Sequence, residues 1–393
     1  MECIDRTPPF IHSSSSSSLP HSSLSHSSER VIMKTSWLLV SIIVCLSKVT
    51  TQLTSPKTNG DNTEDFLLLK EYDEIKKRPL EDLTNFTTVY KNPEGRLIRA
   101  FDYSRRDNKF FMSIANERGT ETEKLVVEHN GSSRVLCENA AMKKYEHLAF
   151  DWIGNNLFFQ EEEFDLVEGR ISSRSFISVC TMDGRFYRRL IEIEDDRDVK
   201  GFVIHPKRGL LFWHDSPLFA GSRKRNPYRI MMANMDGSQV QLLVRSKSQM
   251  GKMFAIDRVN HDIYFENEEE DKILRVNIDS KKTDVVASDL HFSSETMAYH
   301  NGFLYLHNSY GSLRVLEVSG ARVQKVLELP SRQVDSPRLI VNDSLHQLEP
   351  SAGNPCLGCS WICVIVPDFT AKCLCPDGYT SSGTTCIPLH QKK

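Results

Sequence analysis

Residues 147–160 read His-Leu-Ala-Phe-Asp-Trp-Ile-Gly-Asn-Asn-Leu-Phe-Phe-Gln, and this stretch decides the fold. An apolar run that ends in Asp151 is followed by a turn containing Gly154 and then by the aromatic run 157–159. Apolar and aromatic runs separated by glycine and asparagine predict two short strands joined by a tight turn. A unit this small cannot bury its own apolar face, so its recurrence along the chain would predict a repeat protein.

The same unit occurs five times. The predicted first strands are residues 97–102, 147–152, 201–206, 253–258 and 296–300, and the second strands are 110–112, 157–159, 211–213, 263–265 and 304–306. A third and a fourth strand follow around hairpin-turn dipeptides such as Asn130-Gly131, Asp183-Gly184 and Asp236-Gly237. Because four strands in each repeat of about 40–53 residues is typical of a propeller blade, the region is predicted to be all-β.

The two ends of the repeat region complete each other. Residues 66–69, 74–77 and 86–90 supply three strands with no first strand before them, and residues 337–342 supply a first strand with little after it. We therefore expect a sixth blade in which 66–90 pairs with 337–349, so that the propeller spans 66–349 and leaves no free sheet edge at its closure.

The stretch 147–160 resembles the class B repeat of low-density-lipoprotein-receptor relatives, which reads Leu-Ala-Val-Asp-Trp, a glycine-containing turn and then Leu-Tyr-Trp-Thr-Asp. The resemblance covers about 66–349 and implies a six-bladed propeller of the YWTD type. This sequence departs from the Tyr-Trp-Thr-Asp motif in every blade, and the nearest match is Phe212-Trp213-His214-Asp215. Aromatic bulk is kept while the Thr-Asp pair is mostly lost, so the ligands of better-matched relatives transfer poorly.

Six of the ten cysteines lie within residues 356–386. So short a segment cannot bury an adequate core, which favours a disulfide framework over a zinc site, since no histidine stands at ligand spacing within it. The cluster, with Cys375-Pro-Asp-Gly-Tyr379, resembles the EGF-like module that follows such propellers, here 354–387 with a short tail at 388–393. That resemblance implies the pairs Cys356–Cys363, Cys359–Cys373 and Cys375–Cys386, whereas spacing alone leaves 15 pairings open. No acidic calcium-binding pattern precedes Cys356, so we expect no metal.

The N-terminal segment predicts export from the cell. Residues 37–46 form a short apolar run directly after Met33-Lys34, which fits a signal peptide at 33–51 and is too short to cross a bilayer. Residues 1–32 are serine-rich and are expected to be a disordered leader or an over-extended start, and 52–65 a linker. Sequons at Asn85, Asn130 and Asn342 are candidate glycan sites on surface loops. We expect a secreted protein with no membrane span in its mature chain.

The composition of the chain limits the classes of partner that we expect it to bind. The net charge of −3 over 393 residues gives no general attraction to nucleic acid or anionic membrane, so we expect neither as a partner. No motif requires a cofactor, and we expect a monomer that binds an extracellular protein ligand.

Charged loops after the second strands are the candidate binding residues. Three sectors in successive blades are predicted to crowd one propeller face, an acidic one at 161–176, a basic one at 216–227 and a second acidic one at 266–271, although each could equally be solvated loop surface. The candidates are Glu161, Glu162, Glu163, Phe164, Asp165, Phe219, Arg223, Lys224, Arg225, Glu268 and Glu269. Residues 223–225 could instead be a processing site.

Two further groups of residues have alternative interpretations. Cys137 and Cys180 could form an inter-blade disulfide or remain buried thiols. The histidines His205, His214, His300 and His307 could respond to acidification or be ordinary core histidines.

Three functional classes compete. A secreted receptor-like modulator or decoy fits the propeller and EGF-like module without class A ligand-binding modules. A matrix or basement-membrane linker is the alternative. A calcium-dependent propeller hydrolase is the least supported, because no nucleophile elbow, zinc motif or repeated carboxylate set is present, and we expect no enzyme activity.

Overall fold

A computed structural model describes residues 65–115, 123–137, 143–167, 170–218, 227–319, 322–328, 338–342, 347, 353–382 and 385–389. The predicted leader, signal peptide and most of the linker lie outside these residues. In the described part of the chain the regular structure is β-strand with two short 3₁₀ turns, and no helix there is long and apolar enough to cross a membrane. The all-β prediction is confirmed.

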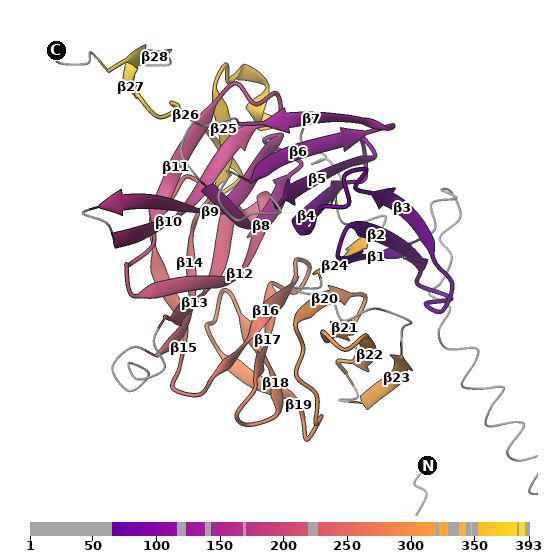
Figure 1. Ribbon diagram of the computed structural model, residues 1–393. Coiled ribbons are helices and arrows are strands. Elements are labelled where there is room, and N and C mark those ends of the chain that lie inside the picture. Colours follow the sequence, from indigo (N-terminus) through magenta and orange to yellow (C-terminus); the bar gives the residue numbers. More distant parts are fainter. Residues whose placement is uncertain are drawn as a thin grey trace, which may run out of the picture. The chain divides into compact units, whose positions relative to one another are not determined.

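Six four-stranded antiparallel sheets follow one another as the blades of a propeller (Figure 1). Blade 1 holds β4 (Ile98–Ser104), β5 (Lys109–Ile114), β6 (Lys124–His129) and β7 (Ser132–Leu136). Blade 2 holds β8 (Lys143–Asp151), β9 (Asn156–Val167), β10 (Arg170–Thr181) and β11 (Tyr187–Glu192). Blade 3 holds β12 (Arg197–His205), β13 (Leu210–Pro217), β14 (Tyr228–Asn234) and β15 (Gln241–Ser246), with the 3₁₀ turn η1 (Pro206–Arg208) after β12.

Blade 4 holds β16 (Met250–Asp257), β17 (Asp262–Asn267), β18 (Lys272–Asn277) and β19 (Thr283–Ser288). Blade 5 holds β20 (Thr296–His300), β21 (Phe303–His307), β22 (Ser312–Glu317) and β23 (Arg322–Glu328). First strands of neighbouring blades contact one another, so they are the inner strands of the propeller.

Blade 6 is assembled from two distant parts of the chain. β24 (Arg338–Asn342) pairs antiparallel with β1 (Phe66–Glu71), which continues into β2 (Glu74–Pro79) and β3 (Thr87–Lys91). The register sets Phe66 opposite Asn342 and Lys70 opposite Arg338. Because both edges of β1 are hydrogen-bonded, the ring is closed by strands whose paired residues lie about 270 positions apart in the sequence.

The core lies between blades. Leu148, Phe150 and Phe159 of blade 2 pack with Ala100 and Phe111 of blade 1. The opposite face of the same blade 2 sheet packs on blade 3, since side chains alternate along each strand. Cys137 after β7 is joined to Cys180 on β10 with Cα atoms 6.4 Å apart, so a disulfide also links blades 1 and 2.

The expectation that residues 161–176 form a loop is wrong. β9 and β10 continue through this segment as one long hairpin, paired from Asn156↔Thr181 to Val167↔Arg170. The strands continue because Glu161 points into the sheet interior, where it is fully buried and meets Arg189, while Glu162 and Glu163 are only partly buried. In a strand, successive side chains point to opposite faces of the sheet. A run of three glutamates hides this alternation because all three residues are polar.

The C-terminal module is a compact disulfide-linked unit that packs on blades 1 to 3. It holds the 3₁₀ turn η3 (Pro355–Gly358), β25 (Ile362–Val366), β26 (Thr370–Leu374), β27 (Tyr379–Ser382) and β28 (Thr385–Pro388). The structure joins Cys356 to Cys363, Cys359 to Cys373 and Cys375 to Cys386. Ile362, Val364 and Leu374 enter the apolar cluster between blades 2 and 3.

Candidate functional site

The propeller has two faces that differ in which turns they carry. Since strands alternate in direction, the turns between second and third strands lie on one face together with the blade-to-blade links, and we call this the hairpin face. The turns between first and second and between third and fourth strands lie on the other. The C-terminal module contacts that second face, through Asn354 to Ile153 and Lys372 to Asp236, so we call it the module face.

The predicted acidic sector of blade 2 is divided by the pleat of the hairpin. Glu161 is fully buried and accepts hydrogen bonds from Ser178, Tyr187 and Arg189, so it supports the sheet instead of facing a ligand. Glu163 is also paired with Arg189, at 2.9 Å, and with Arg174. Burial raises the pKa of Glu162. Phe164 is half-buried, and the side chain of Asp165 lies outside the described residues.

The basic sector is mostly outside the part of the chain that the structure describes. Phe219, Arg223, Lys224 and Arg225 fall in the gap between residues 218 and 227. β13 ends at Pro217, and Leu218 directly after it is 48% exposed on the hairpin face.

The acidic sector of blade 4 has one buried and several exposed members. Glu266 is buried and accepts the N–H of Ser294 at 2.9 Å, and burial raises its pKa to about 7. Glu268 is half-buried and its pKa is also raised by burial, while Glu269 is exposed. The structure therefore presents Glu268 and Glu269 on the hairpin face and withdraws Glu266 into the interior.

Two exposed aromatic residues on the same face were missed by the sequence analysis. Tyr310 is 79% exposed in the β21–β22 turn of blade 5, and Tyr72 is 53% exposed in the β1–β2 turn of the neighbouring blade 6. Asn308 fixes the first turn, because its side-chain oxygen accepts the N–H groups of Tyr310 and Ser312. The Asn-x-Tyr-Gly turn could have been read from the sequence, but its exposure could not.

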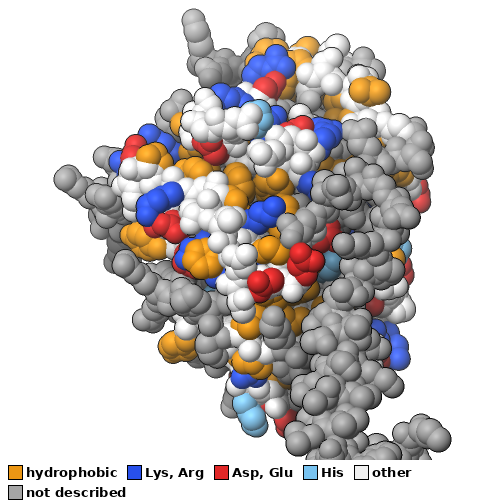
Figure 2. Space-filling model, turned by 90° about the vertical axis from the view of Figure 1, so that its right-hand side faces the viewer, with side chains coloured by type: hydrophobic (Ala, Val, Ile, Leu, Met, Phe, Trp, Pro, Cys, Tyr) orange, Lys and Arg blue, Asp and Glu red, His pale blue; other side chains and the backbone are white. Residues whose placement is uncertain are grey.

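Ion pairs line the inner part of the hairpin face at the start of the first strands. Lys144 on β8 is paired with Glu146 and lies 4.0 Å from Glu162 of β9. Lys252 on β16 is paired with Glu295 at 2.5 Å. Both signs of charge are also interspersed on the side of the molecule that Figure 2 shows. A surface of this mixed kind suits a polar macromolecular partner better than a single-sign polymer.

A further acidic turn lies on the hairpin face. Residues 194–196 read Glu-Asp-Asp and link blade 2 to blade 3 on the hairpin face. Glu194 and Asp195 are exposed, and Glu194 pairs with Arg229 at 3.1 Å. This turn is not among the binding residues predicted from the sequence.

Three of the four candidate histidines do not respond to mild acidification. Burial lowers the pKa of His205 to about 3, and the pKa values of His214 and His307 to about 4. These three side chains are buried and stay neutral at mildly acidic pH, which favours the interpretation of core histidines.

The sequons differ in their surroundings. Asn85 and Asn130 are exposed in turns. Asn342 is not on a loop, since it is the last residue of β24 and its backbone pairs with Phe66. Within the described residues no group of three or more His, Cys, Asp or Glu is placed to hold a metal ion.

Comparisons with known proteins agree with this fold. No protein-family model matches the chain. It is 25% identical over 229 residues to the vitellogenin receptor of Solenopsis invicta, covering 57% of this chain and 11% of that one. It is 21% identical over 160 residues to the human low-density lipoprotein receptor-related protein 5-like protein, covering 41% of this chain and 56% of that one. The chain thus spans about a tenth and just over half of these relatives.

A solved structure of a nidogen/laminin complex contains a chain with the same fold. The TM-score is 0.56 at 17% sequence identity, with 70% of this chain and 98% of that chain covered. Together with the six four-stranded sheets and the C-terminal disulfides, these likenesses confirm the resemblance proposed from residues 147–160. The chain is a six-bladed β-propeller related to those of low-density-lipoprotein-receptor relatives, followed by a disulfide-rich module that fits the EGF-like pattern.

Proposed function

We propose that this protein is a secreted binding module that recognises an extracellular protein through the hairpin face of its propeller, as a soluble receptor-like modulator or decoy. One observation carries the proposal. Two exposed tyrosines, Tyr72 and Tyr310, lie on adjacent blades of the hairpin face, while the C-terminal module occupies part of the other face.

Tyrosines of this kind are typical anchors of protein interfaces, because they bury a large apolar area while keeping a hydroxyl for hydrogen bonding. They lie on turns of rigid antiparallel hairpins, so little conformational entropy is lost when a partner orders them. Leu218 adds a third exposed apolar side chain on the same face.

Charge indicates the kind of partner. The turns 194–196 and 268–271 carry seven carboxylates on the hairpin face, and the cations paired with them include Arg229 and Lys272. These two acidic turns favour a ligand whose contact surface includes basic groups, and such a ligand would also associate faster at low ionic strength.

The test is affinity capture with secreted 52–393 as bait against extracellular proteins and cell surfaces, followed by titration of each captured partner. The double variant Tyr72→Ser with Tyr310→Ser should weaken binding at least tenfold, about 1.4 kcal/mol or more. Val259→Ser is the matched control, because Val259 is 81% exposed in the β16–β17 turn of the module face.

Equal weakening by the control, or no weakening by the double variant, would refute the assignment of the face. A partner recovered only from deposited matrix would favour the matrix-linker alternative. Absence of any saturable partner for a folded bait would refute protein binding itself.

A further inference from the structure

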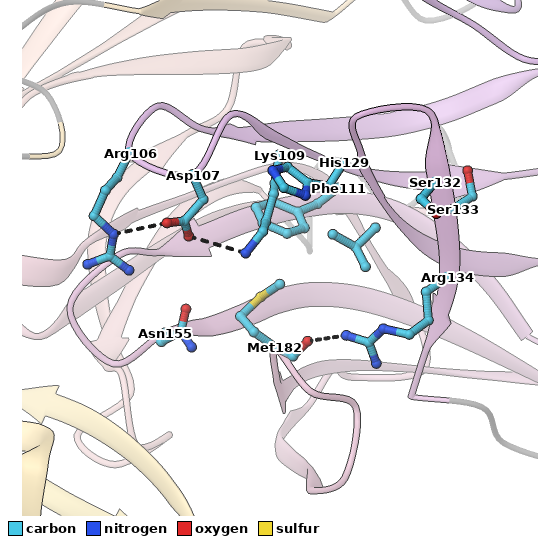
Figure 3. A pocket seen from close by; sticks show the side chains of 11 residues that line it. Arg106, Asp107, Lys109, Phe111, His129, Ser132, Ser133, Arg134, Asn155 and Met182 are labelled. Atoms are coloured by element: carbon cyan, nitrogen blue, oxygen red, sulfur yellow. Dashed lines mark hydrogen bonds and ion pairs between the residues drawn. The ribbon is translucent and has the colours of Figure 1, made fainter.

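A cavity of about 570 Å³ opens on the module face between blades 1 and 2 (Figure 3). Four turns build it, namely β4–β5, β6–β7, β8–β9 and β10–β11. Its size lies within the range of about 300–1,000 Å³ typical of small-ligand sites. It is on the opposite face from the proposed protein-binding surface, so the inference below does not depend on the proposed function.

The cavity walls carry an excess of positive charge. On one side the carboxylate of Asp107 forms ion pairs with Nε of Arg106 at 3.3 Å and with Nζ of Lys109 at 3.6 Å. One carboxylate is therefore shared by two cations. Arg134 forms the opposite side, as Figure 3 shows. His129 also lines the cavity. Three permanent cations therefore surround the space against a single carboxylate.

Arg134 is held in a fixed position. Its Nη1 donates to the carbonyl oxygen of Asp183 at 2.9 Å, and its Nη2 donates to that of Met182 at 2.8 Å. A guanidinium has five N–H donors, so these two bonds orient the group without using all of them. A fixed guanidinium is well suited to bind an oxyanion, because its donors match the spacing of two oxygens.

Three of the remaining lining residues are polar. Ser132, Ser133 and Asn155 contribute hydroxyl and amide groups. Phe111 and Val127 lie at the cavity but are buried, so Met182 is the one apolar lining residue with a partly exposed side chain. A protein partner would find no aromatic or aliphatic anchor here. A polar ligand bearing both hydroxyl groups and a negative charge fits the lining.

We propose that this cavity binds an acidic saccharide, with its sulfate or carboxylate group between Lys109 and Arg134 and its hydroxyl groups against Ser132 and Asn155. Sulfate and carboxylate share the same recognition chemistry at this site, namely charge-assisted hydrogen bonds from the two cations.

The sequon at Asn130 has to be removed before the test. Asn130 lies in the β6–β7 turn with φ 52°, and its side-chain nitrogen is 3.3 Å from Nε2 of the cavity residue His129. A glycan there would lie at the rim. Asn130→Gly eliminates the sequon and keeps the turn, because glycine adopts positive φ at no steric cost.

Calorimetric titration of the Asn130→Gly protein would use three probes of matched length: a sulfated heparin hexasaccharide, a carboxylate-only hyaluronan hexasaccharide and a hexaglutamate peptide. We expect one or both saccharides to bind more tightly than the peptide, with affinity falling as salt rises. Tighter binding of the heparin hexasaccharide would identify sulfate as the preferred group. Tighter binding of the hyaluronan hexasaccharide would identify carboxylate.

Arg106→Glu with Lys109→Glu should weaken saccharide binding at least tenfold, and the milder Lys109→Met tests the same point if the double variant does not fold. Lys282→Glu is the control, since Lys282 is an exposed cation in the β18–β19 turn of the module face and should leave binding unchanged. The proposal is overturned if neither saccharide binds, if hexaglutamate binds as tightly, or if the Lys109 and Lys282 variants weaken binding equally.

Discussion

Asp151 stabilises the turn between the first two strands of blade 2, although its burial disfavours the charged form of its carboxylate. It ends the first strand of blade 2 and is fully buried. Its Oδ1 accepts the N–H groups of Ile153 and Gly154, both at 3.1 Å, and so closes the turn into β9. Its Oδ2 accepts a hydrogen bond from the side-chain Nδ2 of Asn156, which also donates to the carbonyl oxygen of Cys363 in the C-terminal module. Despite these bonds, burial raises the pKa of Asp151 to about 6.

This raised pKa predicts a specific pH dependence. The unfolded chain releases the Asp151 proton near pH 4, and the folded chain releases it near pH 6. Between these values the folded state holds more protons, so the contribution of Asp151 to stability falls as pH rises through the window, by about 3 kcal/mol in total.

Urea unfolding of the natural chain and of Asp151→Asn between pH 4 and pH 7 tests this prediction. Asparagine can still accept the two backbone N–H groups but does not titrate in this range. We expect the stability of the natural chain relative to the variant to decrease as pH rises. A difference that is constant across the window would contradict the raised pKa.

At the scale of elements, close packing of the C-terminal module depends on turns of the propeller. Gly209 follows η1 with φ 67°, and a Cβ added there would lie 2.5 Å from the backbone of Val366. A Cβ added at Gly154 would likewise lie 2.3 Å from the carbonyl oxygen of Cys363. The module can approach blades 2 and 3 this closely only because neither turn has a side chain at these positions.

Gly209→Ala should therefore loosen the module, and Gly95→Ala provides a matched control. Gly95 has φ 66°, but nothing lies within 4 Å of its added Cβ. Both substitutions incur a backbone cost of about 1–2 kcal/mol, and only Gly209→Ala also forces Val366 to move. Hydrogen exchange over 362–374 should rise in the Gly209 variant alone. Equal exchange in both variants would show that the contact does not hold the module.

The length of the strands is also decided at this scale. The predicted strands match β9 and β10 at their module-face ends, where Leu157 and Phe158 are apolar, but they stop too early at the acidic run. Glu161 is accommodated in a strand because Arg189 of β11 and the hydroxyl groups of Ser178 and Tyr187 surround it. Those partners lie 17 to 28 residues away and cannot be assigned from local pattern.

For the whole molecule, the closure of blade 6 makes the two ends of the propeller interdependent. Leu68 on β1 is 1% exposed and packs with Phe101 and Met112 of blade 1. Its strand is also the partner of β24, so the same residue stabilises the junction between the first and last parts of the ring.

Leu68→Ala should lower the stability of the entire propeller by about 2–5 kcal/mol. Because the ring is closed, we expect a single transition. The tryptophan fluorescence, which reports on Trp152 of blade 2, Trp213 of blade 3 and Trp361 of the C-terminal module, should change together with the strand signal in circular dichroism. Val285→Ala on the outer strand β19 is the control, with Val285 57% exposed. Separate transitions for the two signals would show that blade 6 unfolds independently.

The sequence by itself determined the fold class, the strand cores and the existence of a split sixth blade, because each depends on local alternation, turn residues and repeat spacing. It also indicated a disulfide-rich module after the propeller. The tertiary structure alone decided which side chains of those strands reach the surface. Glu161 and Glu266 are buried by partners distant in the sequence, and Tyr72 and Tyr310 are exposed on turns of two adjacent blades. Lys109 and Arg134 line opposite sides of a cavity built by four separate turns. Whether a side chain is exposed, and which side chains lie close together, depends on how the blades pack against one another. The sequence of a single blade therefore cannot predict either property.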